Sequence, residues 1–177
     1  MQVCPSSATF GTMNRRVIVI TAMLALVAFG AWWFSPAERI KRRVHAMIDA
    51  AAVPATMGNL SRSTRGHDVA KFFAPSLEIV SSDSLRDDVP AEIRRDEAAS
   101  LYAGVARYVR EVSLVDPEIT RLDIAGDSAE VDFIVDAIVQ LSNRRPIDGL
   151  LHARTRWTRD PEHGWVMERI EWVESPR

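Results

Sequence analysis

The clearest pattern in the chain is the alternation of apolar and polar residues over Ala129–Gln140. The odd positions are all apolar, whereas the even positions are polar or charged except at Ile134 and Ile138. Alternation of this kind is typical of a strand that turns one face to a core and the other away from it. Two more strands are expected to follow across short turns, over Gly149–Thr158 and Trp165–Val173.

The residues before this strand show the spacing of helices. Ser35–Glu38 places Ser, Pro and Glu where a helix start favours them, and Pro54 is expected to end that helix. A second, weaker helix is predicted over Met57–Phe73, where Gly66 interrupts the pattern, and a third from about Asp88 to Arg110. We expect the third helix to bury its apolar stripe. That stripe consists of Leu101, Tyr102, Val105, Tyr108 and Val109.

The expected order of elements is helix, helix, a short strand at Ser76–Ser81, a long helix, and a series of antiparallel strands that begins at Glu118. This order resembles the nuclear transport factor 2-like fold, the cystatin-like cone, over roughly residues 37–174. The resemblance implies an α+β domain in which helices pack on a curved antiparallel sheet that wraps the long third helix. Members of this fold range from isomerases to scaffolds, some of them tethered to a membrane by one preceding anchor. The fold alone therefore assigns no activity.

An uncharged segment, Val17–Phe34, precedes this domain. Its eighteen residues match the lower end of a bilayer-spanning helix, which takes about 17–25 residues, and Trp32 and Trp33 stand at its far end. The alternative is a cleaved signal peptide, because Ala28–Gly30 offers small residues at a cleavage site. We therefore divide the chain into a tail (1–16), a transmembrane anchor or signal segment (17–34) and the cone-shaped domain (35–177).

Basic residues flank the apolar segment on both sides. Arg15 and Arg16 precede it, and four basic residues lie between Arg39 and Arg43. The number of Lys and Arg residues on each side of the segment favours a cytoplasmic domain. In contrast, the basic start and the apolar segment together resemble an export signal, which favours a periplasmic domain. We expect a single-pass protein of the bacterial inner membrane with a periplasmic domain, and the cytoplasmic orientation stays open.

Composition narrows the classes of function. Twenty-two basic and twenty-four acidic side chains nearly cancel, so no overall positive field would attract nucleic acid. Cys4 is the only cysteine, which rules out an intrachain disulfide. The four histidines are scattered without metal-ligand spacing, and no glycine-rich phosphate loop is present. We therefore expect neither a metal nor a cofactor.

Acid–base chemistry in such a fold would need titratable groups inside the cone. The apolar face of the strand over Ala129–Gln140 offers none. Asp132 and Asp136 share the opposite face but stand about 13 Å apart along it, too far to share a proton. The candidates for a pocket or its rim are His45, His67, Tyr102 and Asp123.

The polar face of the central strand is expected to form a surface of complementary charges around two isoleucines. We call it the outer-face patch, and it consists of Asp132, Ile134, Asp136, Ile138, Arg154 and Arg156. Such a patch suits the interface of a homodimer or a partner membrane protein. The function that we expect is a membrane-anchored binding or scaffold module without catalysis. The alternative is a small-molecule enzyme of the isomerase or cyclase kind.

Overall fold

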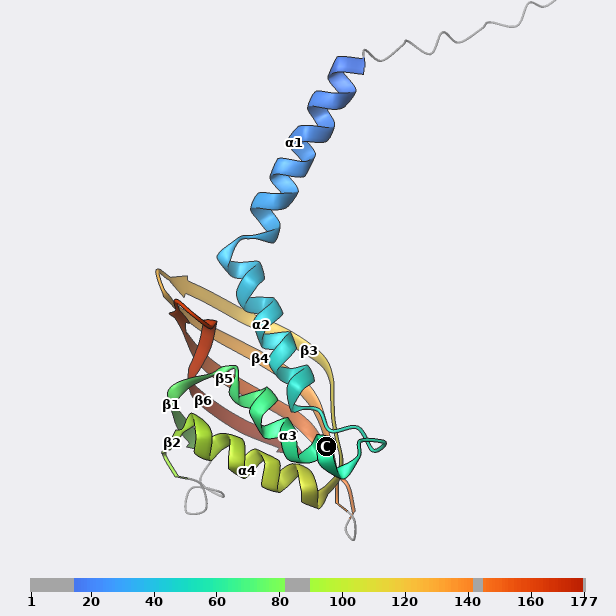
Figure 1. Cartoon of the computed structure of the whole chain (residues 1–177), viewed down its shortest axis with the longest axis vertical. Helices are drawn as coiled ribbons and strands as arrows, with labels where there is room; N and C mark the ends of the chain where they lie inside the picture. Colours follow the sequence, from blue (N-terminus) through green and yellow to red (C-terminus); the bar gives the residue numbers. More distant parts are fainter. Residues whose placement is uncertain (1–14, 82–89, 142–144, 177) are drawn as a thin grey trace, which may run out of the picture.

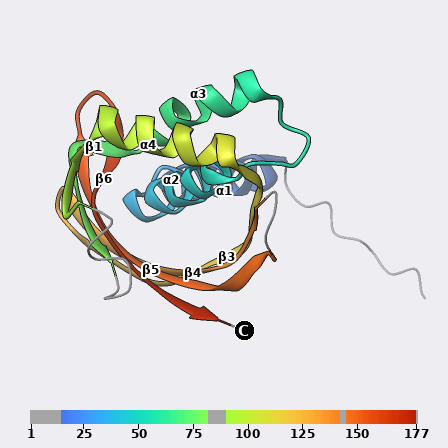
Figure 2. The same cartoon turned by 90° about the horizontal axis from the view of Figure 1, so that it is seen from below.

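The computed structural model describes residues 15–81, 90–141 and 145–176. A six-stranded sheet with the order β2-β1-β6-β5-β4-β3 curves around the helices (Figures 1 and 2). The helices are α1 (Arg15–Trp33), α2 (Pro36–Ala51), α3 (Asn59–Ala70) and α4 (Arg95–Tyr108). The strands are β1 (Phe73–Ser81), β2 (Glu92–Arg94), β3 (Val109–Ala125), β4 (Ser128–Leu141), β5 (Ile147–Asp160) and β6 (Gly164–Pro176).

The face assignment of the central strand is confirmed. In β4, Val131, Phe133 and Val135 are at most 3% exposed, and they belong to the main core. In β5, Ala153 lies opposite Phe133, and Trp157 is completely buried. The concave face of the sheet therefore carries the core, as the alternation predicted.

The sheet is mixed, so the predicted purely antiparallel sheet is wrong at one edge. β1 runs parallel to β6, with Ile79 opposite Ile170, and β2 adds antiparallel to β1. The third helix of the domain begins at Arg95, later than predicted, because Ile93 is buried as part of β2. The predicted start near Asp88 lies outside the described residues.

The helix in the hollow of the sheet is α2, whereas the resemblance implied the long third helix (Figure 2). Ile40 and Val44 of α2 are completely buried in the core. Its predicted start is confirmed, because Ser35 is the N-cap and its Oγ accepts a hydrogen bond from the N–H of Glu38 at 3.3 Å. In contrast, the buried residues of α4 are all alanines.

Gly66 allows α3 and α4 to pack closely, and it does not interrupt α3 as expected. A Cβ atom at this position would lie 1.9 Å from the carbonyl oxygen of Ala99 on α4. No side chain larger than hydrogen fits there without moving one helix away from the other.

A buried arginine joins the beginning of α3 to the end of α4. Arg62 on α3 is 6% exposed, and its guanidinium group donates to five backbone carbonyl groups at 2.6–3.3 Å. Burying a charge is tolerable only when its donors are satisfied. The acceptors belong to Pro54, Met57, Ala106, Val109 and Arg110.

Helix α1 extends away from the cone (Figure 1). Within the described residues, no single helix is both long and apolar enough to cross a membrane. Ile18–Trp33 and Pro36–Ala51 reach that length and composition only when taken together, with a bend of 56° between them. The anchor predicted at Val17–Phe34 is therefore not supported as one continuous span. Most of the expected tail, 1–16, lies outside the described residues.

Candidate functional site

A cavity of about 390 Å³ lies between α2, α4 and the concave face of the sheet. Its lining side chains come from helices and strands alike and are almost all aliphatic or aromatic. Within residues 15–81, 90–141 and 145–176, no charged residue lines it, and Tyr102 and Trp172 contribute the only side-chain oxygen and nitrogen atoms. The volume falls in the usual range of small-molecule sites, about 300–1,000 Å³.

The cavity occupies the end of the cone that lies farther from α1. Only the C-terminal half of α2 lines it, through Met47, Ile48 and Ala51. The N-terminal half of α2 packs in the main hydrophobic core, where Ile40 and Val44 are completely buried. The cone is therefore filled next to α1 and hollow at the other end.

The apolar stripe of α4 faces this hollow. Leu101, Tyr102 and Val105 line the cavity, yet Leu101 and Val105 are 57% and 54% exposed. The prediction that these two residues are buried is therefore wrong, as it is for Tyr108, which is 81% exposed. Large apolar side chains that border an open hollow leave apolar surface for another molecule to cover.

Tyr102 contributes its ring to the cavity wall and directs its hydroxyl group elsewhere. The hydroxyl donates a hydrogen bond to the carbonyl group of Ala51 at the end of α2. Burial raises the pKa of this phenol, and the nearby charge of Arg65 opposes that shift only in part. The phenol therefore stays protonated at neutral pH. Arg65 itself donates to the carbonyl groups of Asp49 and Ala52, at 2.8 and 3.1 Å.

The other three pocket candidates lie elsewhere. His45 on α2 and His67 on α3 are exposed, and neither lines the cavity. Asp123 is exposed on β3, where its Oδ2 accepts a hydrogen bond from Nε of Arg121 at 2.6 Å. The structure thus brings Tyr102 alone, among the four candidates, to the wall of the cavity.

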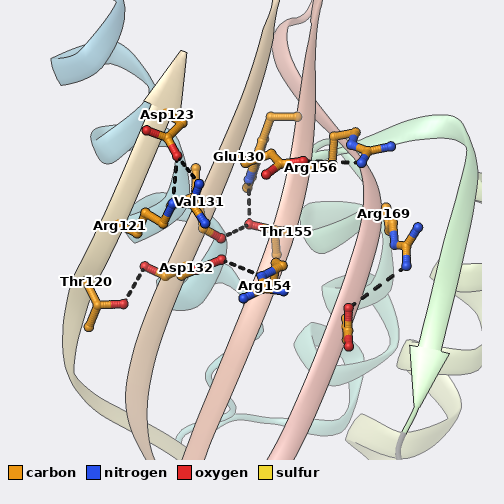
Figure 3. Close-up of polar contacts among 12 residues, drawn as sticks. Thr120, Arg121, Asp123, Glu130, Val131, Asp132, Arg154, Thr155, Arg156 and Arg169 are labelled. Atoms are coloured by element: carbon orange, nitrogen blue, oxygen red, sulfur yellow. Dashed lines mark hydrogen bonds and ion pairs between the residues drawn. The ribbon is translucent and has the colours of Figure 1, made fainter. Parts of the chain in front are cut away.

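The outer-face patch carries an ordered set of charges on the convex side of the sheet (Figure 3). Arg154 donates through Nε to Oδ1 of Asp132 at 3.1 Å, and this hydrogen bond raises the pKa of the Arg154 guanidinium. Arg156 donates to Glu130 at 3.2 Å. Sequence reasoning missed Glu130, although it precedes Asp132 on the same face of β4, and the register places it opposite Arg156.

A second hollow, of about 270 Å³, lies on this outer face. Its lining includes Asp132, Ile134 and Arg154 of the patch, together with His152. Its mixture of charged and apolar side chains is typical of protein surfaces. Among the described residues, no group of three or more His, Cys, Asp or Glu side chains could hold a metal ion.

Comparison with known proteins identifies the fold. No family model matches the chain, and no curated protein matches it. A solved structure of a putative scytalone dehydratase from Novosphingobium aromaticivorans is 18% identical, with a TM-score of 0.57 over 85% of this chain and 86% of that one. A nuclear transport factor 2-like protein with a cystatin-like fold from the same organism is 16% identical, with a TM-score of 0.54 over 92% and 91%.

A nuclear transport factor 2-like superfamily protein from Salmonella enterica is also similar, with 12% identity and a TM-score of 0.55 over 79% of this chain and 91% of that one. Identities this low show a shared fold and nothing finer. The domain therefore has the nuclear transport factor 2-like, cystatin-like cone fold: helices packed on a curved, mixed sheet.

Proposed function

We propose that the protein is a non-catalytic binding module that holds the apolar part of a ligand in the cavity of the cone. The observation that carries this proposal is the chemistry of the cavity wall. In the part of the chain that the structure describes, its lining is uncharged and mainly aliphatic and aromatic, and Leu101 and Val105 leave apolar surface exposed at its edge. Covering apolar surface contributes about 25 cal/mol per Å², so an apolar ligand gains affinity there without a polar anchor.

An acid–base enzyme has less support. Putative dehydratases occur among the similar structures, but at 15% and 18% identity they share the fold alone. Proton transfer needs a positioned acid or base within reach of the substrate. Within the described residues, no Asp, Glu or His lines the cavity, and the protonated hydroxyl of Tyr102 is bonded to the backbone of Ala51.

The proposal includes attachment to a membrane through α1. The large apolar side chains of α1 from Ile18 to Val27 are exposed in the chain by itself, each by 47% or more. Trp32 and Trp33 follow at the end nearer the cone, and amphipathic rings favour the membrane interface. Arg42 of α2 lies 4.2 Å from the centre of the Trp33 ring and donates to the Trp33 carbonyl group at 2.7 Å. These contacts join α1 to the cone.

The binding proposal is tested with the full chain in nanodiscs of dioleoylphosphatidylcholine, by equilibrium dialysis of radiolabelled dodecanol. Empty nanodiscs provide the background. Leu101→Trp adds bulk inside the cavity, whereas Leu60→Trp makes the same change at an 82% exposed leucine of α3 that does not line it. We expect saturable binding by wild type and Leu60→Trp, and at least tenfold weaker binding by Leu101→Trp. Equal binding by all three would remove the cavity as the site.

The membrane proposal has its own test. Membranes from cells that produce the full chain are washed with high salt and with alkaline carbonate. We expect the protein to stay in the membrane fraction. Release by the wash, or recovery of a soluble form that begins at Ala31, would show that α1 is not an anchor. Either result would leave the binding proposal intact, because α1 does not line the cavity.

A further inference from the structure

Four basic side chains lie near the start of α2, next to the end of α1 (Figure 1). The structure gives two of them partners within the chain. Lys41 forms an ion pair with Glu38 at 3.0 Å. Arg43 donates to the carbonyl groups of Trp165 and Lys71, at 3.0 and 2.7 Å, so its guanidinium group holds α2 against the cone. These two basic residues therefore serve the domain itself.

The other two basic residues, Arg39 and Arg42, lie over aromatic rings. Among the described residues, neither of them forms an ion pair with a carboxylate. Cζ of Arg39 is 5.6 Å from the centre of the Phe34 ring, and Cζ of Arg42 is 4.2 Å from the centre of the Trp33 ring. Because the two arginines are three residues apart on α2, they share one face of the helix. The junction of α1 and α2 thus carries a pair of positive charges that no carboxylate offsets.

The guanidinium group of Arg42 has an unused donor. Its Nη2 donates to the carbonyl group of Trp33 at 2.7 Å, whereas Nη1 is covered by the chain and has no hydrogen-bond partner within the described residues. A buried donor without an acceptor costs stability, and a bound ion is one of the partners that removes this cost. Arg42 as a whole is half-buried and Arg39 is exposed, so an anion can approach both side chains.

The neighbouring rings indicate where this pair of arginines would lie in a membrane. Trp32 and Trp33 are the last residues of α1, and Phe34 follows them; all three are exposed. Amphipathic rings favour the membrane interface, which is the layer that contains the head groups and their phosphates. The two guanidinium groups that lie over these rings are therefore at the level of the head groups when α1 is in the bilayer.

We propose that Arg39 and Arg42 together bind the phosphate group of an anionic phospholipid in the membrane around α1. This proposal rests on the attachment of α1 proposed above and adds the class of lipid. A guanidinium group presents paired N–H donors that match phosphate oxygens, and two positive charges favour a lipid of net negative charge over a zwitterionic one. Glu38 is the only carboxylate between residues 35 and 43, and its ion pair with Lys41 keeps it from neutralising the site.

The test uses the full chain in liposomes of dioleoylphosphatidylcholine that contain increasing amounts of a phospholipid brominated on its acyl chains. Bromine quenches tryptophan fluorescence at short range, and α1 carries Trp32 and Trp33. The brominated lipid is phosphatidylglycerol in one series and phosphatidylcholine in the other, at physiological ionic strength. The two quenching curves of each protein variant give its preference for the anionic lipid. The series is repeated with millimolar inorganic phosphate at the same ionic strength.

Two double variants examine the site, and a third is the matched control. Arg39→Gln plus Arg42→Gln removes both charges, whereas Arg39→Lys plus Arg42→Lys keeps the charges and removes the planar forks. Arg107→Gln plus Arg110→Gln removes two charges with the same spacing from exposed positions at the end of α4 and the start of β3. Arg39→Gln alone changes an exposed residue, so the test does not depend on a variant that loosens α2.

We expect wild type and the control to prefer phosphatidylglycerol about fivefold or more, with or without inorganic phosphate. The preference should vanish in the double Gln variant and fall about twofold or more in the double Lys variant and in Arg39→Gln. Equal quenching by both lipids in wild type, an unchanged preference in either double variant of the site, or its loss in inorganic phosphate would overturn the lipid site and leave the attachment intact. No quenching of wild type by either lipid would instead overturn the attachment of α1.

Discussion

The hydroxyl group of Tyr102 on α4 donates a hydrogen bond to the carbonyl group of Ala51, the last residue of α2. This contact joins the two helices that border the cavity. Because the hydroxyl group of Tyr102 is engaged in this hydrogen bond, the residue presents mainly its aromatic ring to the cavity. The apolar character of the site thus depends on one polar contact at its edge.

The first prediction follows from the pKa of Tyr102. Burial raises the pKa of its phenol above the ordinary value, so the folded state favours the protonated form. The resulting stabilisation is complete below the unfolded pKa, about 10, and is lost as the pH rises through the folded pKa. Tyr102→Phe also removes the hydrogen bond to Ala51, so it should lower the free energy of unfolding by about 0.5–1.5 kcal/mol at pH 7.

The alkaline titration separates this effect from general loss of stability. As the pH rises above about 10, the ordinary pKa of tyrosine, wild type should lose more stability than Tyr102→Phe, measured by urea unfolding at each pH. Tyr108→Phe is the matched control, because Tyr108 is 81% exposed, and it should follow wild type. Parallel curves for all three proteins would contradict the buried, bonded state of the Tyr102 hydroxyl.

The second prediction concerns the contact between α3 and α4. Gly66→Ala would place a Cβ atom 1.9 Å from the carbonyl oxygen of Ala99, so the helices must separate. We expect a loss of about 1–3 kcal/mol, the usual range for overpacking. Gly104→Ala on α4 meets no atom within 4 Å and should stabilise the protein by up to about 1 kcal/mol through helix propensity. Urea midpoints that shift in the same direction for both variants would disprove this account of the packing.

The third prediction concerns Arg62. Arg62→Met keeps most of the length of the side chain but removes the guanidinium N–H groups that donate to five backbone carbonyl groups. Because several of these carbonyls are buried, we expect a loss of roughly 2–5 kcal/mol. Arg107→Met, at an exposed position of α4, should cost less than about 1 kcal/mol. Comparable losses for the two variants in urea unfolding would show that the carbonyl contacts of Arg62 contribute little.

The fourth prediction concerns association through the outer-face patch. Ile138 is 36% exposed and Ile134 is half-buried, with the Asp132–Arg154 ion pair nearby. The homodimer stays a prediction, and light scattering on the fragment 35–177 at micromolar concentration tests it. The double variant Ile134→Lys plus Ile138→Lys should be monomeric and folded, whereas Leu60→Lys should remain a dimer. A monomeric wild-type fragment would disprove the predicted homodimer.

The parts of the fold that sequence predicted best depend on local patterns. The helix start at Ser35 was readable because the cap and the first turn use fixed residue types at fixed positions. The faces of β4 were readable because the side-chain period of a strand is two. The parallel pairing of β1 with β6 was not, because it joins residues far apart in the chain and leaves no local signal.

The cavity could be predicted only in part, for a related reason. The stripe with Leu101 and Val105 has the same spacing whether side chains or empty space lie opposite it, so the pattern indicated the face but not the exposure. Similarly, Arg62 resembles any polar residue on a surface helix in the sequence, because tertiary packing brings its carbonyl partners together from the segment before α3 and from the junction of α4 and β3. Such features depend on tertiary packing and have no signature in the local sequence.

The most direct test of the central claim is a crystal structure of the protein saturated with 12-bromododecanol, with the bromine located by anomalous scattering. The account predicts one bromine peak inside the cavity, against the apolar side chains of α2, α4 and the sheet that line it. A bromine peak confined to α1 or to the outer-face patch, with the cavity empty at saturation, would contradict the account.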